Sequence, residues 1–165
     1  MKRGKIQLWG VGAAGLLVAG VLIWWFVAEI PDTRLGNPAT ESVQSLESTQ
    51  IEIGRTTYQA NCAQCHGANA EGQPFWQQRN TDGTLKPPPH DETGHTWHHS
   101  DGLLFRIVRD GGTIYETPGF KSSMPAFGDR LSSEEIKAVI TYFKSLWGPE
   151  IRSSQAEVSQ RDPFP

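Results

Sequence analysis

Residues 62–66 read Cys-Ala-Gln-Cys-His, and their types and spacing are those of a haem attachment site. The pattern C-x-x-C-H is typical of covalent binding of a c-type haem. In a helical turn the thiols of Cys62 and Cys65 face the same side, where both can add to the vinyl groups of one porphyrin. His66 follows directly and is then placed beneath the iron as its proximal ligand. The run therefore predicts one haem c, attached through Cys62 and Cys65.

Other uses of Cys62 and Cys65 are less well supported by the surrounding sequence. A structural disulfide between them is geometrically possible. A thioredoxin-like redox pair requires a β-α-β context, and no β-rich apolar run flanks the motif. A zinc site could combine the two thiols with His95 and His99, but 29 residues separate Cys65 from His95, which is longer than compact zinc modules favour. Haem attachment is therefore the favoured interpretation.

A second axial ligand for the iron is suggested by Met124, which lies 58 residues after His66 in the run Lys-Ser-Ser-Met-Pro-Ala-Phe. A thioether opposite a histidine raises the reduction potential and suits electron transfer rather than oxygen chemistry. The alternative is that Met124 fills a gap in the core. A methionine followed by proline in a polar loop is a poor core position, so ligation is favoured.

The first of three predicted helices, 50–60, leads directly into the haem motif. Gly54 at its middle lowers helix stability, which suggests that another helix packs closely at that point. Tyr142 or Phe143 of the last predicted helix could cover Gly54 and pack near Tyr58. The first and last helices are therefore expected to touch at Gly54.

Two further helices have clear start and stop signals. The second, 101–109, has Ser100 as its N-cap and ends at two glycines. The third, 132–147, begins with a capping box formed by Ser132 and Glu135 and ends before a Gly-Pro pair. Each has one apolar face, which is the usual mark of core packing. These faces consist of Leu103, Leu104, Ile107 and Val108 in the second helix and of Ile136, Val139, Ile140, Phe143, Leu146 and Trp147 in the third.

Residues 50–148 resemble a class I c-type cytochrome. The features that carry the resemblance are Gly54, Tyr58, the CAQCH run, the MPAF run and the terminal helix SSEEIKAVITYFKSLW. The resemblance implies an all-α class I cytochrome c fold around one covalent haem, with a low-spin iron ligated by His66 and Met124. It also implies that backbone in a Pro-rich stretch accepts a hydrogen bond from the proximal histidine, which fixes the ring. The candidates are Pro87, Pro88 and Pro89.

The segment Phe75–His99 departs from that pattern as a long insertion. It can be a belt over the haem, in which Trp97 and a histidine contact the propionates or line the pocket. It can also be a solvated loop with incidental histidines, or a copper or zinc site, although the spacing selects no geometry. The belt is favoured. The insertion holds four of the five histidines of the chain, namely His90, His95, His98 and His99.

Residues 1–29 read as a basic, cytoplasmic N-terminus followed by a transmembrane anchor. The 21 residues of 8–28 carry no charge, and a helix of that length spans about 31 Å, close to a hydrocarbon core of about 30 Å. Basic residues precede it and acidic residues follow it, which exports the rest of the chain. A cleaved signal peptide is the alternative, but the apolar run is long for one, and cleavage after Ala28 would put bulky Phe26 where a small residue is required. A single-pass membrane protein with its haem domain on the periplasmic side is expected.

The remaining segments are polar. Residues 30–49 are expected to be a flexible tether between the membrane and the domain at 50–148. Residues 149–165, which are rich in Ser and Gln, are expected to be a disordered tail.

The charge balance of 15 Lys and Arg against 18 Asp and Glu gives a net charge of −3, so a nucleic-acid partner is disfavoured. The sequence predicts a tethered monohaem cytochrome, not an enzyme, that carries single electrons between membrane-bound or soluble redox proteins of a respiratory or photosynthetic chain. The same domain could instead be a permanent haem c subunit of a larger electron-transfer complex. Less favoured are a haem or metal sensor and an enzyme with an open iron site, such as a peroxidase.

Overall fold

The computed structural model describes residues 38–115 and 117–165, with side chains from Glu47 onward except that of Ile114. The predicted membrane anchor at 8–28 lies outside the described residues. Among the helices that are described, none is long and apolar enough to cross a membrane. The chain divides into two compact units, Met1–Glu41 and Ser42–Pro165, and every contact given below lies within the second.

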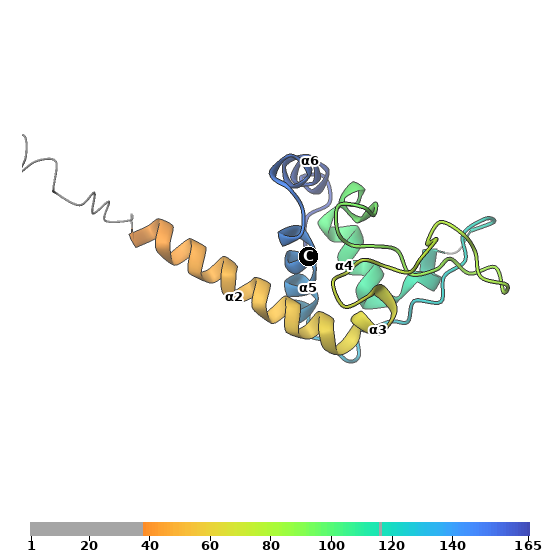
Figure 1. Ribbon diagram of the computed structural model, residues 1–165. Coiled ribbons are helices and arrows are strands. Elements are labelled where there is room, and N and C mark those ends of the chain that lie inside the picture. The colour runs from red at the N-terminus through yellow and green to blue at the C-terminus, as the bar shows by residue number, and fades with distance from the viewer. Residues whose placement is uncertain (1–37, 116) are drawn as a thin grey trace, which may run out of the picture. The chain divides into compact units, whose positions relative to one another are not determined.

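The described part of the chain is helical. In chain order its elements are α2 (Pro38–Asn61), α3 (Ala63–His66), η1 (Thr96–His98), α4 (Asp101–Asp110), η2 (Gly112–Tyr115), α5 (Ser133–Ser145) and α6 (Pro149–Ser159). Apart from two isolated β-bridges, these residues form no strand (Figure 1). The all-α prediction is therefore confirmed for the residues that the structure describes.

Helix α2 begins earlier than predicted, so residues 38–49 are helical and not part of a flexible tether. Pro38 stands at the first helical position, where its missing N–H costs no hydrogen bond. Neither glycine nor proline interrupts the next 15 residues, up to Gly54. Polarity alone led to the wrong expectation, because a polar segment without helix breakers can extend an adjacent helix.

Helices α2 and α5 touch at Gly54, as predicted. A Cβ atom built at Gly54 would overlap the carbonyl oxygen of Ala138 and lie 3.0 Å from the Cβ of Tyr142. One turn further along, the ring of Tyr58 lies 5.3 Å from that of Tyr142 and 5.8 Å from that of Phe143, edge-on to the latter. The absence of a side chain at Gly54 lets the two backbones approach, and the aromatic contacts then fix the crossing.

Helices α4 and α5 contact each other and begin at the predicted caps (Figure 1). Ser100 Oγ accepts from the Leu103 N–H at 3.2 Å. At α5 the capping box is complete, because Ser132 Oγ accepts from the Glu135 N–H and the Glu135 carboxylate accepts from the Ser132 N–H. Each cap satisfies N–H groups that the helix itself leaves unpaired. The apolar faces of α4 and α5 meet in one buried cluster of Leu104, Phe105, Val108, Phe127, Leu131, Ile136 and Ile140.

Helix α6 occupies residues that the sequence assigned to a disordered tail, and that assignment is wrong over Pro149–Ser159. Gly148 is its N-cap and Pro149 begins it, so the Gly-Pro pair that ends one helix also starts the next. Ile151 packs against a second buried cluster formed by α2 and α5. Helix α6 also lies against η1.

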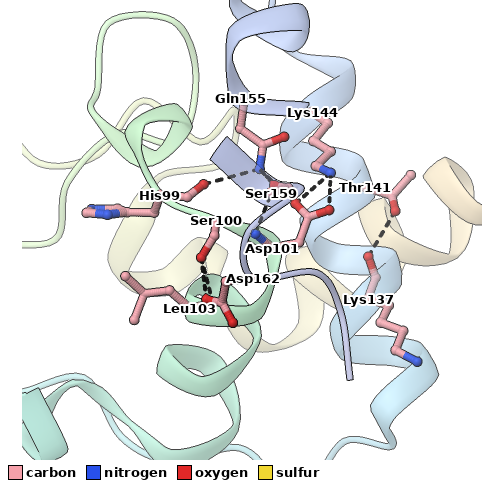
Figure 2. A network of polar contacts seen from close by, with 10 residues as sticks. All are labelled: His99, Ser100, Asp101, Leu103, Lys137, Thr141, Lys144, Gln155, Ser159 and Asp162. Atoms are coloured by element: carbon pink, nitrogen blue, oxygen red, sulfur yellow. Dashed lines mark hydrogen bonds and ion pairs between the residues drawn. The ribbon is translucent and has the colours of Figure 1, made fainter. Parts of the chain in front are cut away.

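Figure 2 shows the polar contacts that hold α6 and the residues after it. The Gln155 side chain is 1% exposed, and its Nε2 lies 2.7 Å from Asp101 Oδ1 and 2.8 Å from Ser159 Oγ. Ser159 Oγ accepts from the Asp101 N–H at 3.1 Å. Lys144 of α5 pairs with Asp101 at 2.6 Å. The start of α4 is therefore tied to both α5 and α6 by one network.

Candidate functional site

The C-x-x-C-H run consists of Cys62, which lies between α2 and α3, and of the single turn of α3 itself. The Cys62 N–H donates to the Tyr58 carbonyl at 2.8 Å and the His66 N–H donates to the Cys62 carbonyl at 3.0 Å, so the run continues the helical hydrogen bonding. Both thiols are free, with Cys62 half-buried and Cys65 exposed. Burial raises the pKa of the Cys62 thiol to about 11, and the neighbouring Cys65 adds to the rise. Two thiols and an imidazole thus share one turn.

His66 is 8% exposed, and its Nδ1 lies 3.0 Å from the carbonyl oxygen of Pro88. A carbonyl only accepts, so Nδ1 must carry the proton and Nε2 the lone pair. Burial lowers the pKa of His66, while the bond to Pro88 opposes that change. The imidazole is therefore a neutral base whose Nε2 lone pair is available to bind a metal. Of the three prolines proposed from the sequence, Pro88 supplies the bond.

The Pro87–Pro89 segment can approach His66 because Gly72, against which it packs, has no side chain. Gly72 has φ +70°, and a Cβ there would overlap the backbone between Pro88 and Pro89. The Gly72 N–H donates to the His66 carbonyl at 2.7 Å, and the Gln73 N–H donates to the Pro87 carbonyl at 3.0 Å. These bonds tie the backbone at Gly72 and Gln73 to His66 on one side and to the proline segment on the other.

His90 lies against the face of His66, a contact that the sequence did not reveal. The two rings are stacked, with centroids 4.3 Å apart and an interplanar angle of 29°. On its other face His90 stacks on Phe143, at 4.2 Å and 19°. Burial lowers the pKa of His90 well below its ordinary value, and the nearby His66 adds to this effect. From the sequence alone His90 is grouped with the other belt histidines, because the spacing of residues does not indicate which ring a histidine packs on.

Met124 is half-buried and packs against the cluster shared by α4 and α5. Its N–H donates to Ser122 Oγ at 3.2 Å, and its carbonyl accepts from the Gly112 N–H at 3.0 Å. Further along the loop, the Phe127 N–H donates to carbonyls at the end of α4. The loop that carries Met124 is therefore attached to the C-terminal end of α4.

The structure brings Cys62, Cys65 and His66 together and places Met124 beside a different apolar cluster. Cys62 packs against the second cluster, which contains Tyr58, Ala70, Val139, Tyr142, Phe143 and Trp147. Helix α5 contributes residues to both clusters, Ile136 and Ile140 to one and Val139 and Phe143 to the other. The two cysteines and His66 therefore lie in one region of the domain and Met124 in another, and α5 contributes side chains to both regions.

The belt histidines pair with aromatic rings. His95 stacks on Trp76 with its plane tilted by only 3°, and its ring meets that of His99 edge-on. His98 stacks on Trp97 with centroids 3.7 Å apart. Among the residues that the structure describes, no three His, Cys, Asp or Glu side chains gather in a way that could hold a metal ion. The described residues therefore offer no cluster of ligands for the zinc or copper alternatives.

Trp97 leaves a buried donor without an acceptor. Its Nε1 is the one buried side-chain nitrogen or oxygen, in the described part of the chain, that has no hydrogen-bond partner. Buried polar groups are nearly always paired, so an unpaired one indicates a missing acceptor. Haem carries two carboxylates, and a carboxylate is such an acceptor. Two thiols and a neutral imidazole in one turn, with this unpaired donor, fit a covalently bound haem.

Comparison with known proteins agrees with this chemistry. Residues 49–143 match the family described as cytochrome c oxidase, cbb3-type, subunit III. The cbb3-type cytochrome c oxidase subunit FixP of Sinorhizobium medicae is 34% identical over 101 residues, which cover 61% of this chain and 32% of that protein. The gluconate 2-dehydrogenase cytochrome c subunit of Pantoea cypripedii is 27% identical over 117 residues, or 67% of this chain and 23% of that protein.

A smaller relative is cytochrome c6 of Bryopsis maxima, which is 28% identical over 97 residues, or 58% of this chain and 92% of that protein. The chain spans about a third of the length of the FixP relative. No solved structure matches it at a significant level. The family match covers more than half of the chain and includes Cys62 and Cys65. The chain belongs to the family of cbb3-type cytochrome c oxidase subunit III domains, and is a class I c-type cytochrome with one covalently bound haem c.

Proposed function

We propose that this domain is a one-electron carrier in which His66 and Met124 are the two axial ligands of the haem iron. The observation that carries the proposal is the hydrogen bond from His66 Nδ1 to the Pro88 carbonyl, which leaves the Nε2 lone pair for the metal. The bound haem supplies the Fe(III)/Fe(II) couple. Cys62 and Cys65 hold it in place, and no substrate bond is broken.

Filling both axial positions favours electron transfer over catalysis. The Met124 thioether stabilises the reduced iron and raises the potential. Met124 packs against apolar side chains of α4 and α5, which would limit the access of water to an iron that it binds. The unpaired Trp97 Nε1–H would be a donor for a haem propionate, which would give the belt a role in covering the cofactor.

The proposed place of work is the outer face of the cytoplasmic membrane. The uncharged run at 8–28 and the basic residues before it support a single-pass anchor with the haem domain on the periplasmic side. Such an anchor raises the effective concentration of the domain near membrane-bound redox partners, so even a weak docking surface would suffice.

Carbon monoxide tests the closed iron site. We expect the reduced holoprotein to show no spectral change when CO is added, because His66 and Met124 occupy both axial positions. A high-spin reduced spectrum that changes on CO addition, in the unmutated protein, would contradict the carrier and support a sensor or an enzyme with an open iron.

A permanent subunit is the second candidate function, and the names of the relatives favour it, because one is an oxidase subunit and another a dehydrogenase subunit. Mild detergent extraction of the full chain from its native membrane distinguishes the two. Co-purification with other oxidase subunits in fixed ratio supports the subunit. Elution as a lone cytochrome supports the free carrier.

A further inference from the structure

Three flat rings form a column beside the proposed proximal ligand. The imidazole of His90 lies between His66 and Phe143, and its centroid is 4.3 Å from one and 4.2 Å from the other. The planes are within 29° and 19° of parallel, so His90 contacts both rings face to face. Helix α5 supplies the outer ring, and the backbone after Pro89 supplies the central one.

His90 is fixed in this column at three points. Its N–H donates to the Ala70 carbonyl at 2.8 Å, and its carbonyl accepts from Trp147 Nε1 at 2.8 Å. Its Nδ1 lies 2.8 Å from the hydroxyl oxygen of Thr96. The Thr96 hydroxyl donates onward to the Pro89 carbonyl at 3.3 Å, so it accepts from His90. Backbone and ring are both held, which leaves the imidazole no other orientation.

The hydrogen bond to Pro88 restrains His66 at one atom only. An imidazole held at Nδ1 can still tilt about that contact, and the tilt changes the direction in which Nε2 points. A flat ring packed against its face removes that freedom. The acceptor for Nδ1 and the stacking ring belong to the same three-residue run, Pro88–His90, so one short segment restrains both the edge and the face of the ligand.

We propose that His90 is a positioning residue that fixes the plane of the His66 imidazole, and through it the orientation of the axial ligand on the haem iron. This inference rests on the proposed ligation by His66. It assigns to His90 a role distinct from that of the other belt histidines, which stack on tryptophans or meet one another edge-on.

The test compares His90→Ala, which removes the ring, with His90→Phe, which keeps a flat ring in the column. The matched control is His95→Ala, which removes an exposed histidine that stacks on Trp76. The proton NMR shifts of the haem methyl groups in the oxidised protein report the plane of the axial imidazole, and the reduction potential reports its ligand strength. Thermal unfolding is followed in parallel.

We expect His90→Ala to change the spread of the methyl shifts and to shift the potential while His/Met ligation persists. His90→Phe and His95→Ala should keep the pattern of the unmutated protein. If His90→Ala lowers the unfolding temperature but leaves the methyl shifts and the potential unchanged, His90 is only a packing residue and the inference is wrong.

A second variant covers the case in which His90→Ala yields no folded holoprotein. His90→Leu keeps an apolar side chain in the column but removes the flat ring that packs on His66. The inference predicts a change in the methyl shifts, and an unchanged pattern contradicts it. An unmutated protein without His/Met ligation would instead refute the proposed function, so the two failures are distinguishable.

Discussion

At the scale of single residues, the site depends on what surrounds His66. Its Nδ1 proton is held by the Pro88 carbonyl, which selects the tautomer with a lone pair on Nε2. The carbonyl is placed there by a glycine, because the backbone at Gly72 has φ +70° and passes against Pro89 without room for a Cβ. The tautomer of the His66 imidazole is therefore set by backbone groups around it.

Gly72→Ala tests that dependence. We expect it to lower the free energy of unfolding of the holoprotein by about 1–3 kcal/mol and to shift the reduction potential, because the new Cβ displaces the Pro88 carbonyl from His66. Gly83→Ala is the control, since Gly83 also has a positive φ, +85°, but nothing lies within 4 Å of its Cβ position. A change in potential in both variants would contradict the account.

At the scale of elements, α5 joins the parts of the domain. It touches α2 at Gly54, packs against α4, and contributes side chains to both apolar clusters. Because His66 lies near one cluster and Met124 packs on the other, the position of α5 sets the relation between these two proposed ligands. The helix crossing is consequently part of the site as well as of the core.

Gly54→Ala should therefore be destabilising although alanine is the better helix former by about 1 kcal/mol. A Cβ at this position would overlap the Ala138 carbonyl, so we expect a net loss of about 1–3 kcal/mol in urea unfolding. Thr56→Ala, at an exposed position of α2, should stay within about 0.5 kcal/mol of the unmutated protein. Stabilisation by Gly54→Ala would show that the helices do not meet there.

Local signals in the sequence predicted α4, α5 and the haem-binding turn, because caps and apolar periodicity are encoded within a few residues. They missed α6, since its order comes from polar partners far along the chain: Gln155 and Ser159 bond to Asp101, more than 50 residues away. They also missed the ring column at His90, because the stack depends on how the belt folds back onto α5. Hydrophobic patterning carries no information on either contact.

At the scale of the whole molecule, an ion pair holds the C-terminal residues to α4. Both oxygens of Asp162 pair with the Arg106 guanidinium, at 3.0 and 2.9 Å, and one also accepts from the Ser100 hydroxyl. The Arg106 hydrogen bonds, and then that of Ser100, lower the pKa of Asp162 to about 2 from an ordinary value of 3.8. The end of the chain is thus held to the start of α4 by an ionised carboxylate.

This carboxylate makes the stability depend on pH in a defined window. A pKa that is lower in the folded than in the unfolded state stabilises the fold above about pH 4, and the contribution is lost as the pH falls toward about 2. We expect Asp162→Asn to be less stable than the unmutated protein at about pH 6, and the difference to shrink below about pH 4. Urea unfolding across this range measures it, with exposed Asp129→Asn as control. A difference that does not vary with pH would contradict the ion pair.

The oxidised absorption spectrum of the holoprotein, recorded beside that of Met124→Ala, tests the central claim most directly. Coordination of a thioether sulfur to ferric haem gives a weak charge-transfer band at the red end of the spectrum. If His66 and Met124 ligate the iron, the band is present in the unmutated protein and absent from Met124→Ala, while the haem stays covalently attached in both. A ferric haem that lacks the band before mutation, or keeps it without Met124, would contradict the account.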